Sequence, residues 1–594
     1  MIYTIRSKAV SCLVLLAVGF FTLSQRAQAV IPTPDGGYPG FNTAEGQNAL
    51  FHLSTGVGNT AVGWYSLWSD IDGSYNTAIG AGTLISNLGN QNTGEGVQNT
   101  AIGTAALLNN TTGSFNTATG VTALVNNTEG VENTAVGGSA LFSNITGISN
   151  TAVGYHALFT NNGDPSLGEG SYNCAFGAFA LSDNFTGQHN SVFGTFALQF
   201  NTTGVGNTAM GYRALRSNTI AHFNTATGFQ ALISNSTGGQ NTATGASALV
   251  NNTTGSFNTA NGSSALGHNT IGLRNTASGE FSLGNNVTGN DNTATGAEAL
   301  SSNTDGLDNT ANGQAALASN TSGFSNTATG KLALFSNTVG NVNTASGLEA
   351  LRDNIDGEDN TADGYRALSI NTTGDNNTAI GVLALSANTS GAFNTALGRG
   401  AGSNVSTANN VIAIGTSAEN VSNSCYIGHI YSNIQPQVGV DPDLVTINSS
   451  GRLGRANVSS RRYKHDIRSM DKASETIYAL KPVSFRYHKQ YDATQTLAFG
   501  LIAEEVAEVN PDLVGRNPRG QPESVRYEQI NAMLLNEFLK EHKIIREQQT
   551  MIAELKHELA TVLARLKQHD SQIQRVSDQV QIISPELQVV LRDR

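Results

Sequence analysis

The sequence predicts a mainly β chain, in which a repetitive β-solenoid of 17-residue coils precedes a small α+β domain and a C-terminal trimeric coiled coil. Three observations predict this order. A short Asn-Thr-Ala-x-Gly unit recurs at constant spacing through most of the chain, which is typical of stacked coils. The composition changes abruptly after Gly451, and apolar residues follow a heptad pattern near the end of the chain.

The composition departs from that of an ordinary soluble domain. Charged residues make up 13% of the 594 residues, against about 25% in typical domains, and glycine contributes 65 residues. The net charge of −12 divides into +3 for residues 1–29, −18 for 30–451 and +3 for 452–594. This asymmetry excludes one compact enzyme domain, and the long acidic part would repel the phosphates of a nucleic acid.

Residues 1–29 have the pattern of a secretory signal peptide. Arg6 and Lys8 precede the apolar run Val10–Leu23, and Ala27-Gln28-Ala29 supplies small residues for cleavage. The run is short for a transmembrane span, so an uncleaved anchor is the weaker alternative. We therefore expect an exported chain that begins near Val30.

The expected mature chain retains two cysteines, Cys174 and Cys425. Two cysteines in so long a chain do not form a disulfide framework. No other segment is apolar enough to span a membrane, so we expect a secreted or cell-surface protein.

Residues 30–400 consist of one unit copied many times. The unit starts at Asn42 and recurs every 17 residues to Asn394, except for six-residue insertions between Asn76 and Asn99 and between Asn150 and Asn173. A constant period that accommodates whole insertions is typical of a solenoid with loops at one corner.

Each position in the unit has an expected role, counted from Asn as position 0. Glycine at +4 suits a corner with positive φ, and Asn at 0 and +11 suits left-handed turns or stacked side-chain ladders. Ala at +2 and Leu at +8 would fill a thin interior, whereas the variable residue at +3 would point outward. So small an interior favours association of several chains.

Two other interpretations of the repeats are weaker. A disordered Asn/Gly tract would not keep Leu and Ala at fixed positions. A surface that binds ice or mineral needs regular outward Thr, and only the Thr at +1 recurs regularly.

The repeat region resembles the head repeats of trimeric autotransporter adhesins. The resemblance depends on the Asn-Thr-Ala-x-Gly units and on a degenerate copy, Asn410-Val411-Ile412-Ala413-Ile414-Gly415. The period of 17 is longer than that of those heads, and we expect no counterpart of the membrane-anchor barrel that ends them. We take residues 401–455 as this degenerate repeat followed by a β connector.

Four sequence blocks follow Gly451, where charge and helix-forming residues increase. They are Ser459-Ser460-Arg461-Arg462-Tyr463-Lys464-His465-Asp466-Ile467, Leu480-Lys481-Pro482-Val483-Ser484-Phe485-Arg486-Tyr487, Phe499-Gly500-Leu501-Ile502-Ala503-Glu504-Glu505-Val506 and Ser524-Val525-Arg526-Tyr527.

Together these blocks resemble the endosialidase-type intramolecular chaperone domain, which ends phage tail spikes and tail fibres. The resemblance implies that residues 456–530 help three chains to assemble and then cleave themselves off. It also implies a catalytic dyad of Ser459 and Lys464, with Ser460 beside the cleavage site where the family usually has Asp.

The implied chemistry is physically coherent. A serine hydroxyl needs a base to become a good nucleophile, and a lysine can be that base if burial lowers its pKa. Arg461 and Arg462 add like charge beside Lys464. The bond to be cut flanks Ser459 on a side that the sequence leaves open, and a Ser and a Lys five residues apart by chance remain the alternative.

Residues 531–594 predict a helical coiled coil. Apolar residues dominate both core positions of the heptad, and the mixture of Ile, Leu and Val permits a trimer. Gln548 and His569 form polar layers that suit a register signal better than a metal site. The a positions are Ile545, Ile552, Leu559, Leu566, Ile573 and Val580, and the d positions are Gln548, Leu555, Val562, His569, Val576 and Ile583.

These patterns lead to one functional hypothesis and two alternatives. We expect an exported homotrimeric fibre whose C-terminal domain assembles it and removes itself. The first alternative keeps that domain as an uncleaved trimerisation stalk of an adhesive fibre. The second is an enzyme for an external substrate, which no triad or metal cluster supports. We predict no cofactor and no metal, and a cell-surface or glycan ligand stays open.

Overall fold

The chain forms two compact units, Met1–Asn433 and Ile434–Arg594. The computed structural model describes residues 38–164, 167–429, 445–447, 453–455, 460–490, 492–517 and 519–582. The predicted signal peptide lies outside the described residues. Among the helices of the described ranges, none has the length and apolar content needed to cross a bilayer.

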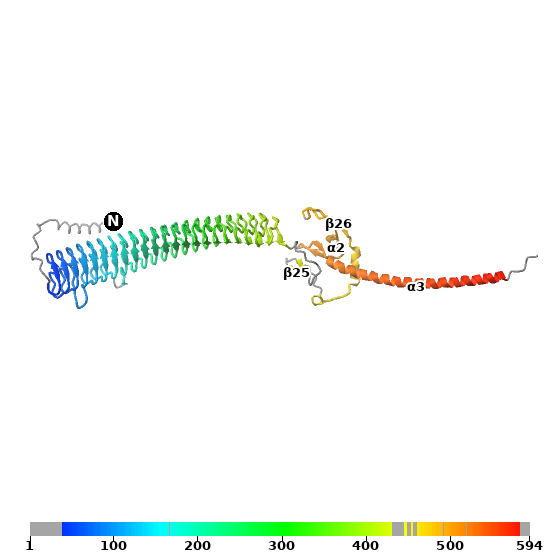
Figure 1. Cartoon of the computed structure of the whole chain (residues 1–594), viewed down its shortest axis with the longest axis horizontal. Coiled ribbons are helices and arrows are strands. Elements are labelled where there is room, and N and C mark those ends of the chain that lie inside the picture. The colour runs from blue at the N-terminus through cyan, green and yellow to red at the C-terminus, as the bar shows by residue number, and fades with distance from the viewer. Residues whose placement is uncertain are drawn as a thin grey trace, which may run out of the picture. The chain divides into compact units, whose positions relative to one another are not determined.

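The first unit is a β-solenoid, which confirms the prediction from the 17-residue period (Figure 1). Each coil contributes one short strand, and consecutive strands pair in parallel to form a 23-stranded sheet. The strands are β1 (Thr43–Glu45), β2 (Thr60–Val62), β3 (Thr77–Ile79), β4 (Thr100–Ile102), β5 (Thr117–Thr119), β6 (Thr134–Val136), β7 (Thr151–Val153), β8 (Cys174–Phe176), β9 (Ser191–Phe193), β10 (Thr208–Met210), β11 (Thr225–Thr227), β12 (Thr242–Thr244), β13 (Thr259–Asn261), β14 (Thr276–Ser278), β15 (Thr293–Thr295), β16 (Thr310–Asn312), β17 (Thr327–Thr329), β18 (Thr344–Ser346), β19 (Thr361–Asp363), β20 (Thr378–Ile380), β21 (Thr395–Leu397), β22 (Val411–Ile414) and β23 (Ser424–Ile427).

The strand register follows the repeat, with Thr at +1 paired to Thr at +1 of the next coil. The two insertions leave this register intact, since Thr77 pairs with Thr100 and Thr151 with Cys174. In the degenerate copy, the position equivalent to the repeat Asn is shifted by one residue along the sequence. Its Val411, and not Asn410, takes the place of the repeat Asn and donates its backbone N–H to Asn394 Oδ1 at 2.9 Å.

The interior of each coil is small and fully covered. After the first coil, the Ala at +2, such as Ala226, and the Leu at +8, such as Leu232, are almost completely buried wherever they occur, and a second Ala at +7 joins them in most coils. The +3 side chains alternate to the outside, as predicted, and Ile79 is 39% exposed.

Two ladders of buried asparagine run along the solenoid. At position 0, Asn59 Oδ1 accepts the backbone N–H of Asn76 at 2.9 Å, while Asn59 Nδ2 donates to the Gly73 carbonyl at 2.8 Å. At +11, Asn127 Nδ2 donates to Asn110 Oδ1 at 2.8 Å. Because a buried polar group is costly unless it is hydrogen-bonded, these ladders also fix how each coil stacks on the next.

The backbone conformations match the prediction for glycine but not for asparagine. Gly262 at +4 has a φ of +142°, and a Cβ there would lie 2.4 Å from the Gly279 carbonyl oxygen. The ladder asparagines do not take positive φ in the described coils. Instead Leu at +8 does, with a φ of +52° at Leu232, because this places its side chain in the interior.

The second unit is a small α+β region followed by a long helix. A modest apolar core of Val506, Leu513, Val514, Ile530 and Met533 joins the region to the start of the helix. Its elements are β24 (Val445–Ile447), β25 (Leu453–Arg455), η2 (Arg461–Tyr463), η3 (Asp471–Ala479), β26 (Val483–Phe485), β27 (Ala498–Gly500), α2 (Ala503–Val509), η4 (Pro511–Leu513), β28 (Val514–Arg516), β29 (Pro522–Val525) and α3 (Tyr527–Ile582).

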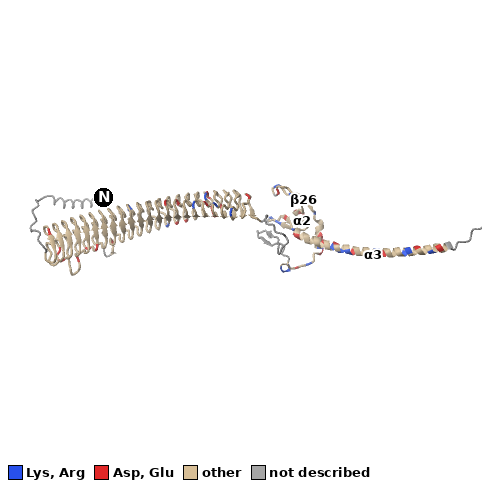
Figure 2. Cartoon of the chain, in the orientation of Figure 1, with Lys and Arg blue, Asp and Glu red and all other residues tan. Residues whose placement is uncertain are grey.

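The strands of this unit form separate antiparallel pairs, β24 with β25, β26 with β27 and β28 with β29. Lysine, arginine and acidic residues follow one another along α3, whereas most of the solenoid carries few charges (Figure 2). The change in composition seen in the sequence therefore coincides with a change of architecture.

Candidate functional site

The predicted dyad lies at the start of the second unit. Ser459 is outside the described residues, so the structure does not give its distance to Lys464. Ser460 caps η2, and its Oγ accepts the backbone N–H of Arg462 at 3.4 Å. Lys464 follows this short helix in an extended conformation, and its backbone N–H donates to the Arg461 carbonyl.

The surroundings of Lys464 are polar and open within a single chain. Lys464, Arg461 and Arg462 are all exposed. The Arg462 guanidinium lies 5.5 Å from the centre of the Tyr463 ring, and this ring is itself largely exposed. The isolated chain therefore presents the lysine of the predicted dyad to solvent.

A more ordered polar cluster lies between η3 and α3. Ser474 Oγ donates to Glu537 Oε1 at 2.5 Å, and Tyr478 Oη donates to Glu537 Oε2 at 3.0 Å. Lys540 Nζ donates to Glu537 Oε1 at 2.6 Å and to the Asp471 carbonyl at 2.6 Å. Ser474 and Glu537 are buried, so this cluster fixes η3 on the first turns of α3.

Ser474 and Lys540 also form a serine–lysine pair, with Oγ and Nζ 3.4 Å apart. Their setting argues against catalysis. The hydrogen bond to Glu537 raises the pKa of Lys540 above its usual value, and the bond from Lys540 lowers the pKa of Glu537. This contact favours the ammonium form of Lys540, whereas a base for a serine hydroxyl must be the neutral amine.

Sequence reasoning missed this cluster. Ser474 and Glu537 are 63 positions apart, and neither belongs to a motif with a fixed spacing. The only available signal was the presence of polar residues on the first turns of a helix with an otherwise apolar stripe, which does not identify their partners.

The apolar stripe of α3 is exposed along its length. The predicted a and d residues that are apolar and described have exposed fractions between 49% and 65%. Phe538, which continues the a series toward the start of the helix, is 65% exposed. Such a long exposed apolar stripe marks an interaction surface.

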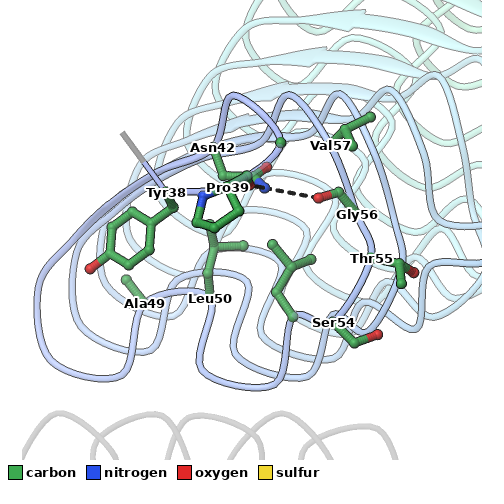
Figure 3. Close-up of a pocket in the computed structure, with 11 residues that line it drawn as sticks. Tyr38, Pro39, Asn42, Ala49, Leu50, Ser54, Thr55, Gly56 and Val57 are labelled. Carbon is green, nitrogen blue, oxygen red and sulfur yellow. Dashed lines mark hydrogen bonds between the residues drawn. The ribbon is translucent and has the colours of Figure 1, made fainter. Parts of the chain in front are cut away.

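The described residues offer few other sites. An open cavity of about 260 Å³ lies at the first coil, lined by Tyr38, Pro39, Leu50 and Leu53 among others (Figure 3). Asn42 also lines it and donates to the Gly56 carbonyl at 2.8 Å. Within the described ranges, no three His, Cys, Asp or Glu side chains are grouped so that they could hold a metal ion.

Comparison with known proteins finds a family match for one segment of the chain. Residues 459–515 match a protein-family model described as the chaperone of endosialidase, which confirms the resemblance seen in the sequence blocks. The match begins at the predicted nucleophile and includes η2, η3, β26, β27 and α2. No curated protein and no solved structure matches the chain.

Proposed function

We propose that this protein is an exported homotrimeric fibre, built by its C-terminal unit and released from that unit by self-cleavage at Ser459 and Lys464. The observation that carries the proposal is the position of the chaperone match. It begins at Ser459, after the boundary at Asn433 between the solenoid and the second unit. A cut beside Ser459 would separate the solenoid from nearly all of its assembly region.

The exposed stripe on α3 supports assembly of several chains. Leu555, Leu559 and Val562 are each about half exposed in the single chain, and together they offer apolar surface at heptad spacing. Burying this stripe against two identical helices would remove it from water. A three-stranded coiled coil is therefore the arrangement we propose for α3.

The proposed cleavage is an acyl transfer within the chain. Lys464 takes the hydroxyl proton of Ser459, whose Oγ attacks an adjacent peptide carbonyl and forms an ester. The proton passes to the departing amine, and water then hydrolyses the ester. The fibre end would carry a new carboxyl group and the released unit a new amino group.

This chemistry predicts a link between assembly and cleavage. A lysine accepts a proton readily where burial disfavours its charged form, and Lys464 is exposed in the single chain. We therefore expect neighbouring chains to cover Lys464 and to activate the dyad only after the trimer has formed.

Expression of the full chain tests the proposal. Wild type should yield two fragments with a new end beside Ser459 by mass spectrometry, while Ser459→Ala and Lys464→Ala should remain whole. Ser484→Ala and Lys481→Ala, exposed residues of the same region, are the matched controls and should cleave normally.

The same measurement distinguishes this proposal from the alternative, in which the fibre is not cleaved. An uncut wild-type trimer would favour a fibre that keeps its chaperone-like end as a stalk. Normal cleavage of Ser459→Ala at the same bond would refute the dyad.

A further inference from the structure

One stretch of the solenoid has the opposite charge to the rest. Residues 170–279 contain three arginines and one carboxylate, Asp183, so their net charge is +2. Residues 30–169 contain nine carboxylates and neither lysine nor arginine, and residues 280–451 contain fifteen carboxylates and four basic residues. The middle coils therefore favour an acidic partner, which the coils on either side would repel.

Two of these arginines, Arg213 and Arg216, lie among aromatic rings in the turn at +5 to +10, which follows each strand. The Arg213 guanidinium lies 5.0 Å from the centre of the Tyr212 ring, and the Arg216 guanidinium lies 4.8 Å from the centre of the Phe200 ring. The Phe196 ring centre is 5.9 Å from the first guanidinium and 6.0 Å from the second. We name as the arginine–aromatic patch the residues Phe196, Phe200, Tyr212, Arg213, Arg216 and Phe229.

The aromatic rings of the patch are open to solvent. Tyr212 and Phe229 are 38% and 53% exposed. Their rings lie nearly parallel, at 16°, with the centres 5.6 Å apart on successive coils. A row of ring contacts also runs from Phe196 through Phe179 to Tyr155. Exposed apolar surface that continues across several coils marks a site of interaction.

The two guanidiniums of the patch are not paired with carboxylates of the solenoid. Within the described residues, neither has a carboxylate at ion-pair distance, whereas Arg274 and Arg352 do. Arg216 donates through Nε to Gln199 Oε1 at 2.9 Å, and Arg213 Nε is buried without an acceptor. The neighbouring rings hold both planar groups in position. A carboxylate could therefore bond to positioned guanidiniums without breaking an ion pair.

The composition of the patch indicates the class of partner. Aromatic residues and arginine are enriched at the cores of protein–protein interfaces, whereas lysine, aspartate and glutamate are depleted there. A sugar chain fits less well, because three of the four rings are phenylalanine, which cannot satisfy buried hydroxyl groups. A nucleic acid carries phosphates along its whole length, and these would meet only two arginines and acidic coils on either side.

We propose that the arginine–aromatic patch binds an acidic segment of another protein, in which carboxylate side chains stand beside apolar ones. The carboxylates pair with Arg213 and Arg216, and the apolar side chains pack on the exposed rings of Tyr212 and Phe229. The site belongs to the solenoid and is separate from the dyad and from α3, so it goes beyond the proposed function.

A library of short random peptides, selected on the full-length protein, provides the test. The selected peptides should be enriched in Asp and Glu beside apolar residues. They should bind the double variant Arg213→Gln, Arg216→Gln at least about tenfold more weakly, because charge-assisted hydrogen bonds to both arginines are lost. Lys331→Gln removes an exposed cation from a later coil and should bind them like wild type.

Ring substitutions test the apolar part of the contact. Phe229→Ser should weaken binding of the selected peptides severalfold. Phe257→Ser is the matched control and should not, because Phe257 is 57% exposed, against 53% for Phe229, and lies outside the patch. Each variant should keep the wild-type melting temperature by circular dichroism, so that a loss of binding does not come from unfolding.

The outcomes decide between the classes of partner. Acidic peptides that depend on both arginines and on Phe229 would establish the site. Selected peptides that are not acidic, or that bind the double arginine variant or Phe229→Ser as tightly as wild type, would overturn it. Tighter binding of oligogalacturonate, a chain of carboxylated sugars, or of single-stranded oligodeoxythymidine to the patch would also overturn it, because the partner would then be a polysaccharide or a nucleic acid.

Discussion

Asp70 stands at the start of the +11 ladder, where it places a buried carboxyl group before the first ladder asparagine, Asn87. Its Oδ1 accepts three donors, namely Asn87 Nδ2 at 3.1 Å and the backbone N–H groups of Gly73 and Gly89 at 3.2 Å. Its Oδ2 is buried and has no hydrogen-bond donor. Desolvation by burial therefore raises the pKa of Asp70 from 3.8 to about 6, although the three donors oppose this rise.

The raised pKa predicts that Asp70→Asn stabilises the first coils at neutral and alkaline pH. Because the folded state holds the proton more tightly than the unfolded state, ionisation opposes folding. The penalty is fully present above pH 6 and is lost as the pH falls toward 3.8. The difference between the folded and unfolded pKa values corresponds to a loss of folding free energy of about 3 kcal/mol.

The substituted amide fits the surrounding structure. In a later coil, Asn110 Nδ2 donates to the Gly113 carbonyl at 2.9 Å, and Gly73 occupies the equivalent place for residue 70. The amide introduced by Asp70→Asn should therefore extend the asparagine ladder by one coil without a charge.

Hydrogen–deuterium exchange of the full chain measures the effect locally. Relative to wild type at the same pH, peptides from residues 67–89 of Asp70→Asn should exchange on the order of 100-fold more slowly at pH 8 and only a few-fold more slowly at pH 4. Asp308→Asn removes an exposed carboxylate elsewhere and should not alter these peptides. Equal protection of Asp70→Asn and wild type at pH 8 would refute the reasoning.

Three further predictions concern other parts of the chain. Gly262→Ala should destabilise its coils by at least about 2 kcal/mol, measured by local hydrogen exchange, because the new methyl group would contact the next coil and the backbone has positive φ. Gly138→Ala is the control and should cause only a small loss of stability, because Gly138 does not have positive φ. Glu537→Gln should lower the melting temperature of the C-terminal unit by several degrees, since Lys540 loses the nearer of its two carboxylate partners and keeps only Glu475 at 3.7 Å. An unchanged melting temperature would show that the cluster is not needed. Leu559→Asp should convert most of the protein to monomers in sedimentation, whereas an assembly equal to wild type would exclude α3 from the contact.

The sequence was sufficient for the solenoid because each coil repeats the same physical solution. Glycine at +4, Ala at +2 and Leu at +8 have the roles that their size and conformational freedom predict. Positive φ at Leu232 could not be predicted, because leucine does not favour it and only the packed interior compensates for the strain.

The C-terminal unit was predictable in the blocks that resemble a family and in the long helix α3, whose heptad pattern is local in the sequence. The blocks around Ser459 and Lys464 gave the chaperone segment, which the family match confirms. The cluster of Ser474, Glu537 and Lys540 depends on the packing of η3 against α3, and no local pattern encodes such a contact between distant residues.

The two loops that interrupt the repeat show how the length of this protein can change. Thr77 still pairs with Thr100, and Thr151 with Cys174, although six more residues intervene than in other coils. The pairing of strands thus depends on the order of the coils and not on the number of residues between them. Removal of one 17-residue coil should therefore shorten the solenoid by one strand spacing and leave the register of the remaining strands in place. Single coils could therefore be added or deleted to set the length of the solenoid, and single positions along its axis could be chosen for labelling.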